Sequence, residues 1–200
     1  MSAFFSTDHG LPVILLIRRV LLRAFELLRE QNYNLAAAIE DQVTAALRST
    51  IESSLRQSGE VSGFNKRKYE TVIRQGQWAN HDGTRLTKTP DLFFKLRDDG
   101  LIRFVGGDYA WAMQEAMMLA YARDGRTIAG HMIPEMTETN RMTSLATVQL
   151  PEACLATAAA ACSEAEAVHT TQHRRNFPWP HGKGPATDIT VYHLWHRCSA

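Results

Sequence analysis

The chain has 200 residues, of which 44% are hydrophobic and 22% are charged, and its formal net charge at pH 7 is +1. This length supports one domain with a real core, and the small net charge excludes a global electrostatic attraction to nucleic acid or membranes. Any contact with a polyanion must therefore come from local clusters of Arg and Lys.

The three cysteines, Cys154, Cys162 and Cys198, are odd in number and show no Cys-x-x-Cys spacing. This pattern excludes a disulfide framework and a structural zinc site, and we interpret the three side chains as reduced thiols.

An apolar segment near the start, "LPVILLIRRVLL" at residues 11–22, is the one stretch that resembles a targeting signal. Its uncharged run is only about seven residues long and its arginines follow the apolar residues, whereas a signal peptide has them before. The segment therefore predicts neither a signal peptide nor a membrane span, and we expect a cytoplasmic protein.

Two helices are predicted first. Pro12 suits a first helical position and opens an apolar helix over residues 12–30. Asn34 can cap a second helix that ends near Gly59. Its apolar residues recur at four-residue steps, namely Leu35, Ile39, Val43, Leu47, Ile51 and Leu55.

A hairpin or two neighbouring strands follow. "KYETVIRQ" at residues 68–75 shows partial alternation, Asp82-Gly83 gives a turn signal, and "PDLFFKLR" at residues 90–97 is a short apolar run. "LIRFV" at residues 101–105 can form another strand.

In the second half of the sequence, predicted helices alternate with predicted strands. "YAWAMQEAMMLAYAR" at residues 109–123 is apolar almost all round, and we predict a buried helix there. "RTIAGHMI" at residues 126–133 predicts a strand, Pro151 opens an alanine-rich helix to about residue 168, residues 169–185 have loop chemistry, and residues 188–196 predict a final strand. This order of elements indicates an α/β or α+β sandwich.

The order of elements resembles the restriction-endonuclease-like, PD-(D/E)XK nuclease superfamily. The resemblance covers residues 34–132 and rests on a helix that carries Glu40, the strand "YETVIR", a strand that begins with Pro90-Asp91, and the helix predicted at residues 109–123, which would pack behind the sheet. The segment "GLIRFVGGDYAWAMQEAMM" at residues 100–118 is also similar to uncharacterised bacterial members of that group. It implies a three-layer α/β sandwich with a mixed central sheet and flanking helices. We expect a single domain, 1–200, with an N-terminal helix at 1–32, a nuclease-like core at 34–133 and an extension at 134–200.

The resemblance also implies a chemistry. Asp91 would be the central ligand of Mg²⁺ and Glu40 a second acid, because a hard divalent ion prefers carboxylate oxygens and activates the attacking water. The family has a further acid, with a lysine two residues later, on the next strand, and this pair is missing here. Lys95 can share the face of Asp91 and substitute for that lysine.

Two functions follow from this pattern. The preferred hypothesis is a degenerate nuclease-like protein that binds nucleic acid or a protein partner without cleavage. The alternative is an active, Mg²⁺-dependent DNA endonuclease that uses Asp91, Glu40 and Lys95. A plain structural interpretation competes with both, since Pro-Asp is common turn chemistry and Glu40 can be a solvated helix residue.

Basic clusters supply the candidate contacts with DNA. Lys66, Arg67 and Lys68 form one cluster, and Arg174 and Arg175 form another. Their charges can contact phosphates, although most such clusters are merely solvated.

A third hypothesis is a histidine-based metalloprotein. His169 and His173 are four residues apart, a spacing that places two imidazoles on one face of a helix, but no glutamate lies between them as in zinc hydrolases. His193 and His196 should point to opposite faces of the last strand, because their separation is odd.

Overall fold

The computed structural model describes residues 10–65, 77–79, 86–88, 105–107, 114–153, 167–179 and 182–198. The chain divides into two compact units, Met1–Ile73 and Arg74–Ser199, and this boundary falls inside the 34–133 core that the sequence analysis expects. No helix of the described residues is both long and apolar enough to cross a bilayer.

The first unit is helical. α1 spans Gly10–Glu30, and a second helical run passes through α2 (Glu40–Thr50), η1 (Ile51–Leu55) and α3 (Arg56–Ser58). The run ends where Gly59 adopts φ +67°, a conformation that favours glycine. Both helices are therefore confirmed, and within the helical run the four-residue stripe forms the buried side, with Val43, Leu47 and Leu55 fully buried. Ile39, just before the helix, is 60% exposed, so the prediction that it belongs to the buried stripe is wrong.

The second helix starts later than the sequence analysis predicts. The Asn34 side chain accepts a hydrogen bond from the Ala37 backbone N–H (3.1 Å), but this closes a turn and not the helix. The helix begins at Glu40, where the Gln42 side chain accepts a bond from the Ile39 N–H (3.2 Å). The cap signal at Asn34 was thus real, but it belongs to the preceding turn.

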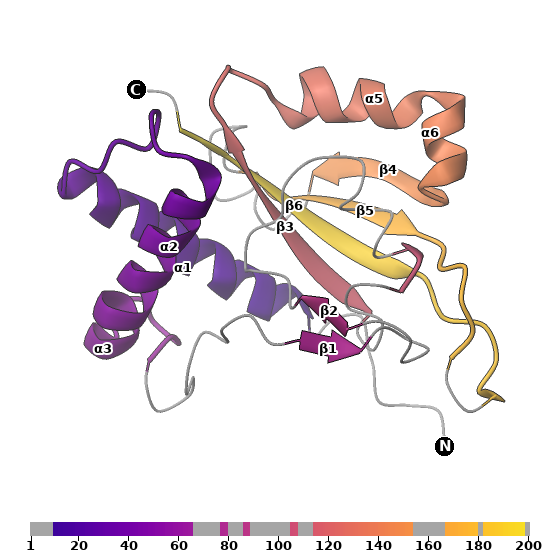
Figure 1. Cartoon of the computed structure of the whole chain (residues 1–200), viewed down its shortest axis with the longest axis horizontal. Helices are drawn as coiled ribbons and strands as arrows, with labels where there is room; N and C mark the ends of the chain where they lie inside the picture. The colour runs from indigo at the N-terminus through magenta and orange to yellow at the C-terminus, as the bar shows by residue number, and fades with distance from the viewer. Residues whose placement is uncertain are drawn as a thin grey trace. The chain divides into compact units, whose positions relative to one another are not determined.

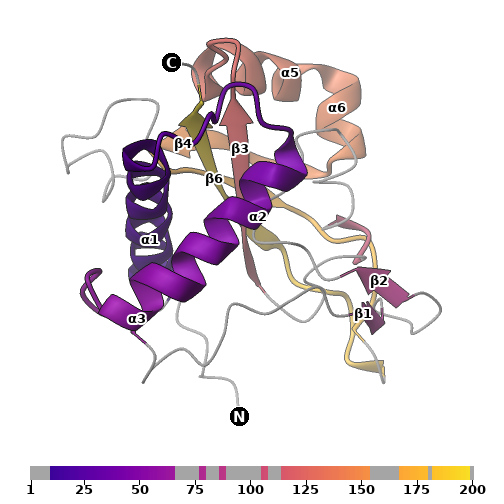
Figure 2. The same ribbon diagram turned by 60° about the vertical axis from the view of Figure 1, so that its left-hand side comes forward.

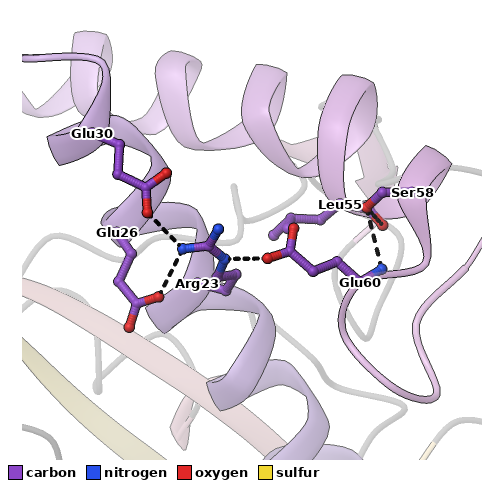
Figure 3. A network of polar contacts seen from close by, with 6 residues as sticks. All are labelled: Arg23, Glu26, Glu30, Leu55, Ser58 and Glu60. Carbon is purple, nitrogen blue, oxygen red and sulfur yellow. Dashed lines mark hydrogen bonds and ion pairs between the residues drawn. The ribbon is translucent and has the colours of Figure 1, made fainter.

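An ion-pair network links α1 to the segment after α3 (Figure 3). The Arg23 guanidinium donates to Glu60 (2.6 Å), Glu30 (2.9 Å) and Glu26 (3.0 Å). The hydrogen bonds that Arg23 donates raise its pKa further above the usual value, with Glu30 contributing most, followed by Glu60 and Glu26. All three carboxylates are exposed, so the network orients the segment without being a major source of stability.

A pair of substitutions separates the contribution of the apolar core to stability from that of the ion-pair network. Leu47→Ala should lower the free energy of unfolding by about 2–5 kcal/mol, because it opens a cavity in the core. Arg23→Met should lower it much less, and the difference from wild type should shrink as salt is added, because exposed charges are screened. Urea titrations followed by circular dichroism measure both. A larger loss for Arg23→Met than for Leu47→Ala would contradict this assignment.

The second unit contains a short hairpin. β1 (Gln77–Ala79) pairs antiparallel with β2 (Leu86–Lys88), with Trp78 opposite Thr87. A hairpin is thus present around the predicted turn signal at Asp82-Gly83, which itself lies outside the described residues. Its strands are not the predicted ones, because the segments 68–75 and 90–97 also lie outside the described residues.

A four-stranded mixed sheet is the centre of the second unit, in the order β3-β6-β5-β4 (Figure 1). Its strands are β3 (Glu115–Ala122), β4 (Thr147–Ala153), β5 (His169–His173) and β6 (Ile189–Arg197). β3 runs parallel to β6, whereas β5 is antiparallel to both β6 and β4.

The sheet confirms one prediction and corrects three. The final strand is present as β6. The predicted helix at 109–123 is wrong over residues 115–122, which form β3. An apolar run without alternation is typical of a strand that is buried on both faces, and periodicity alone does not distinguish it from a buried helix. Pro151 lies within β4 and does not open a helix, and residues 169–173 form β5 where a loop was expected.

The predicted strand at 126–133 is also wrong, because this segment is helical. η2 (Ile128–Met132) continues into α5 (Ile133–Thr137) and is followed by α6 (Thr139–Ser144). The Thr127 hydroxyl accepts a bond from the Gly130 N–H (3.0 Å) and caps the helix start. Tertiary burial of an i, i+4 stripe outweighs the β-branched residues that favoured a strand.

These helices cover one face of the sheet (Figures 1 and 2). The core between the two layers contains Met118, Ile128, Met132, Met136, Leu145, Ile189 and Val191. The chain is thus an α/β protein with a four-stranded mixed sheet and flanking helices.

Candidate functional site

The predicted nuclease residues are only partly visible. Glu40 is the first residue of α2 in the helical unit and is partly exposed. Asp91, Lys95 and the basic segment 66–68 lie outside the described residues. A metal site that joins Asp91 to Glu40 therefore stays a prediction.

β3 places an acid where the sequence analysis expected no strand. Glu115 is its first residue, and the Tyr192 hydroxyl on β6 donates to the Glu115 carboxylate (3.2 Å). Met117, two residues later, lies on the same face and pairs with Tyr192. Glu115 is thus a held, partly buried carboxylate followed at the second position by a thioether.

The two arginines after β5 differ in environment. Arg174 is exposed, and its contact with phosphate stays a prediction. Arg175 is buried, with its guanidinium 5.6 Å from the ring centroid of Phe177 and 5.7 Å from that of Trp179. Burial lowers the pKa of Arg175 to about 10. Its planar cation is engaged in the protein's own packing, so little of it can reach a phosphate.

The C-terminal histidines gather inside the second unit. His169 and His173 lie on β5 and His193 lies opposite His169 on β6, and all three are buried. The period of a strand places His169 and His173 on one face, as a helix would have done. His196 is also buried and lies on the other face of β6 from His193, which confirms the predicted opposition.

Thr171 joins two of these imidazoles. The His173 Nδ1 lies 2.9 Å from the Leu145 carbonyl oxygen, and the His173 Nε2 lies 2.8 Å from the Thr171 hydroxyl. The same hydroxyl lies 2.8 Å from the His193 Nε2. The result is a continuous chain, Leu145–His173–Thr171–His193, that connects the end of α6 to the middle of the sheet.

The chemistry of the donors fixes the direction of the chain. A carbonyl only accepts, so the His173 Nδ1 carries a proton and donates it to Leu145. The Nε2 of neutral His173 is then bare and accepts the Thr171 hydroxyl proton. Thr171 has only one proton, so His193 must donate its Nε2–H to Thr171. The His193 Nδ1 is therefore an unprotonated lone pair.

Burial keeps these rings neutral. It lowers the pKa of His193 to about 3, and the nearby His173 and His169 contribute to this shift as potential like charges. Burial also lowers the His173 pKa, partly offset by the bond to Leu145. With both rings neutral, the hydrogen bonds have the single direction derived above.

Two imidazole nitrogen atoms near the His193 end of the hydrogen-bond chain lack a partner. Among the described residues, neither the buried Nδ1 of His193 nor that of His169 has a hydrogen-bond partner. The indole N–H of Trp195, two residues along β6 on the same face, is also buried without one. Such atoms are rare in protein interiors, and their concentration marks this part of the sheet as a candidate binding site.

Sequence reasoning missed the role of Thr171. The signal was present, because "HTTQH" at residues 169–173 places His, Thr and His at alternate positions. Assigning this segment to a loop hid the alternation.

The comparisons with known proteins add no relative. The chain matches no protein-family model, no curated protein and no solved structure. Within the described part of the chain, no three side chains of His, Cys, Asp and Glu are grouped so that they could hold a metal ion.

The direction of the hydrogen-bond chain can be tested directly. We expect His173 to be the Nδ1–H tautomer and His193 the Nε2–H tautomer, because only this combination satisfies Leu145 and Thr171 together. Long-range ¹H–¹⁵N NMR spectra of labelled protein at neutral pH distinguish the two forms. The opposite tautomer at either ring would contradict the chain.

The lowered pKa of His193 also predicts that the stability of the protein depends on pH. Below a pH of about 6.5, the unfolded state binds a proton at His193 and the folded state does not, so the free energy of unfolding should fall as the pH falls. The slope approaches about 1.4 kcal/mol per pH unit for each such histidine. Urea unfolding between about pH 5 and about pH 8 measures it.

Matched variants identify the histidine responsible. His193→Gln retains an N–H donor for Thr171 but removes the titration, so it should reduce the slope by up to about 1.4 kcal/mol per pH unit. His131→Gln alters an exposed histidine on η2 and should leave the slope unchanged. Equal slopes in the wild type and His193→Gln would refute this origin.

Proposed function

We propose that this chain is a cytoplasmic protein with a restriction-endonuclease-like three-layer sandwich, and that it binds DNA without cleaving it. The observation that carries the loss of cleavage is the composition of β3, where Glu115 is followed at the second position by Met117. In the family that the sequence resembles, an acid with a lysine two residues later occupies the strand after the Pro-Asp strand.

The order of elements supports this alignment of residues with the family. α2 carries Glu40, β1 and β2 follow, Pro90-Asp91 comes two residues after β2, and β3 is the next described strand. A helical layer that packs on the sheet then follows β3. We therefore align the expected acid strand with β3, an alignment that puts Met117 at the position of the family's lysine.

Methionine removes the chemistry of that position. A lysine ammonium contributes a positive charge near the scissile phosphate and N–H donors, and a thioether provides neither. The Tyr192 hydroxyl also holds the Glu115 carboxylate. On this alignment, the described strand β3 supplies no cation at the position where the family has its lysine.

Exposed arginines support a polyanionic partner over a protein partner. β3 and β6 are parallel, so their carboxyl ends meet at one edge of the sheet, with Ala122 paired to Arg197. Arg123, Arg126 and Arg197 are exposed there, and Asp124 offsets part of their charge through a 2.8 Å ion pair with Arg126. Arginine is well suited to phosphate contacts.

The proposal predicts binding without cleavage. Fluorescence anisotropy with labelled duplex DNA should show salt-sensitive binding, with a dissociation constant of roughly 10⁻⁴–10⁻⁶ M at physiological salt. Arg123→Gln combined with Arg197→Gln should weaken it and lower the slope of log K against log salt by about two, one per lost phosphate contact. Arg29→Gln, an exposed substitution on α1, is the charge control.

Cleavage is measured on the same preparations. Plasmid and linear DNA incubated with Mg²⁺ or Mn²⁺ should stay intact. Metal-dependent cleavage that disappears in Asp91→Ala would overturn the loss of activity, and the absence of any DNA binding at low salt would overturn the assigned partner.

A further inference from the structure

Three buried side chains form a row across the middle of the sheet. His193 on β6 lies directly opposite His169 on β5 and directly opposite Met118 on β3. Paired residues of neighbouring strands point to the same face and lie side by side. Their exposed fractions are 8% for His169, 0% for His193 and 1% for Met118. Two imidazoles and a thioether are therefore adjacent in a site closed to solvent.

Two nitrogen atoms of this row have no hydrogen-bond partner among the described residues. The hydrogen-bond chain leaves the His193 Nδ1 unprotonated, and the Nδ1 of His169 has no hydrogen-bond partner among the described residues. A bare buried nitrogen needs a donor or a cation to replace the water it has lost. A proton would satisfy one nitrogen and leave a buried charge, whereas a metal ion would be shared by several donors.

We propose that His169, His193 and Met118 form a binding site for copper(I), with the two Nδ1 atoms and the methionine sulfur as ligands. Thioethers select soft ions such as copper(I), and imidazole suits copper equally well. The ligands are neutral and the ion carries a single charge, so less charge is buried than with a divalent ion. Harder ions such as Mg²⁺ prefer oxygen ligands, and this row contains none.

The hydrogen-bond chain positions the central ligand. Histidines that bind metals usually donate their second N–H to a fixed acceptor, which sets the tautomer and the ring orientation. His193 donates to Thr171, Thr171 to His173, and His173 to the Leu145 carbonyl. Thr171 and His173 are thus positioning residues that direct the free Nδ1 of His193 toward the site.

The surroundings also suit a soft ion. Met118 belongs to the same buried cluster as Met132 of η2 and Met136 of α5, so further thioethers and apolar side chains lie over this part of the sheet. Among the described residues, the charges that act on His193 are those of His173 and His169. This site lies on the opposite face of β3 from Glu115 and Met117, so it does not depend on the proposed DNA binding.

The test is an anaerobic titration of the full-length protein with copper(I) in the presence of a chromophoric chelator. We expect one equivalent to bind. His169→Gln and His193→Gln should each weaken binding by at least about tenfold, and Thr171→Val should weaken it through the orientation of His193. Met118→Leu keeps the volume and removes the sulfur, so it tests the third ligand. His131→Gln, on the exposed side of η2, should bind as the wild type does.

Measurements on the unaltered protein keep the test decisive if a variant fails to fold. X-ray absorption of the copper-loaded protein should show two nitrogen ligands and one sulfur ligand. Long-range NMR should show the Nδ1 signals of His169 and His193 shifting on addition of redox-inert silver(I). The absence of a stoichiometric copper(I) complex, unchanged Nδ1 signals or tighter binding of zinc(II) than of copper(I) would overturn the proposal.

Discussion

The hydroxyl group of Thr171 has a single proton, which it donates to His173. The tautomers of both buried histidines in the hydrogen-bond chain depend on this one bond. The Leu145 carbonyl, at one end of the hydrogen-bond chain, can only accept a proton. This fixes the direction of each bond from there to His193. The chain crosses from the residue that ends α6 to β5 and then to β6. It therefore ties the helical layer to the sheet and fixes two tautomers by one constraint.

The chain lies in surroundings that would otherwise be apolar. Ile189 and Val191 lie beside it on the same face of β6, opposite His173 and Thr171. A buried polar network is tolerated only when its members find partners. A slip of β5 by one residue would move Thr171 and His173 to the face opposite His193 and break the network. The network thus favours one register of β5 on β6, which non-directional apolar packing would specify less strictly.

The sequence predicted elements whose signals are local. The first helix follows from Pro12 and its apolar content, and the second from its four-residue stripe. The turn signal at Asp82-Gly83 indicated a hairpin but not the residues of its strands, and β6 was predicted as the final strand. The sequence-based prediction failed for two neighbouring apolar segments, because burial in the fold outweighs their intrinsic helix or strand propensity. Residues 115–122 are rich in Ala, Met and Leu yet form a strand, and residues 128–133 contain isoleucines yet form a helix.

The candidate sites were harder to predict because they depend on register. Nothing local in the sequence indicates that Met118 lies beside His193, since 75 positions separate them and only the parallel pairing of β3 with β6 brings them together. The same error that made residues 109–123 a helix hid Glu115 and Met117 as a strand pair. Because successive residues of a strand face opposite sides, β3 presents Glu115 and Met117 on one face and Met118 on the other. The two proposals thus concern opposite faces of β3 and can succeed or fail independently of each other.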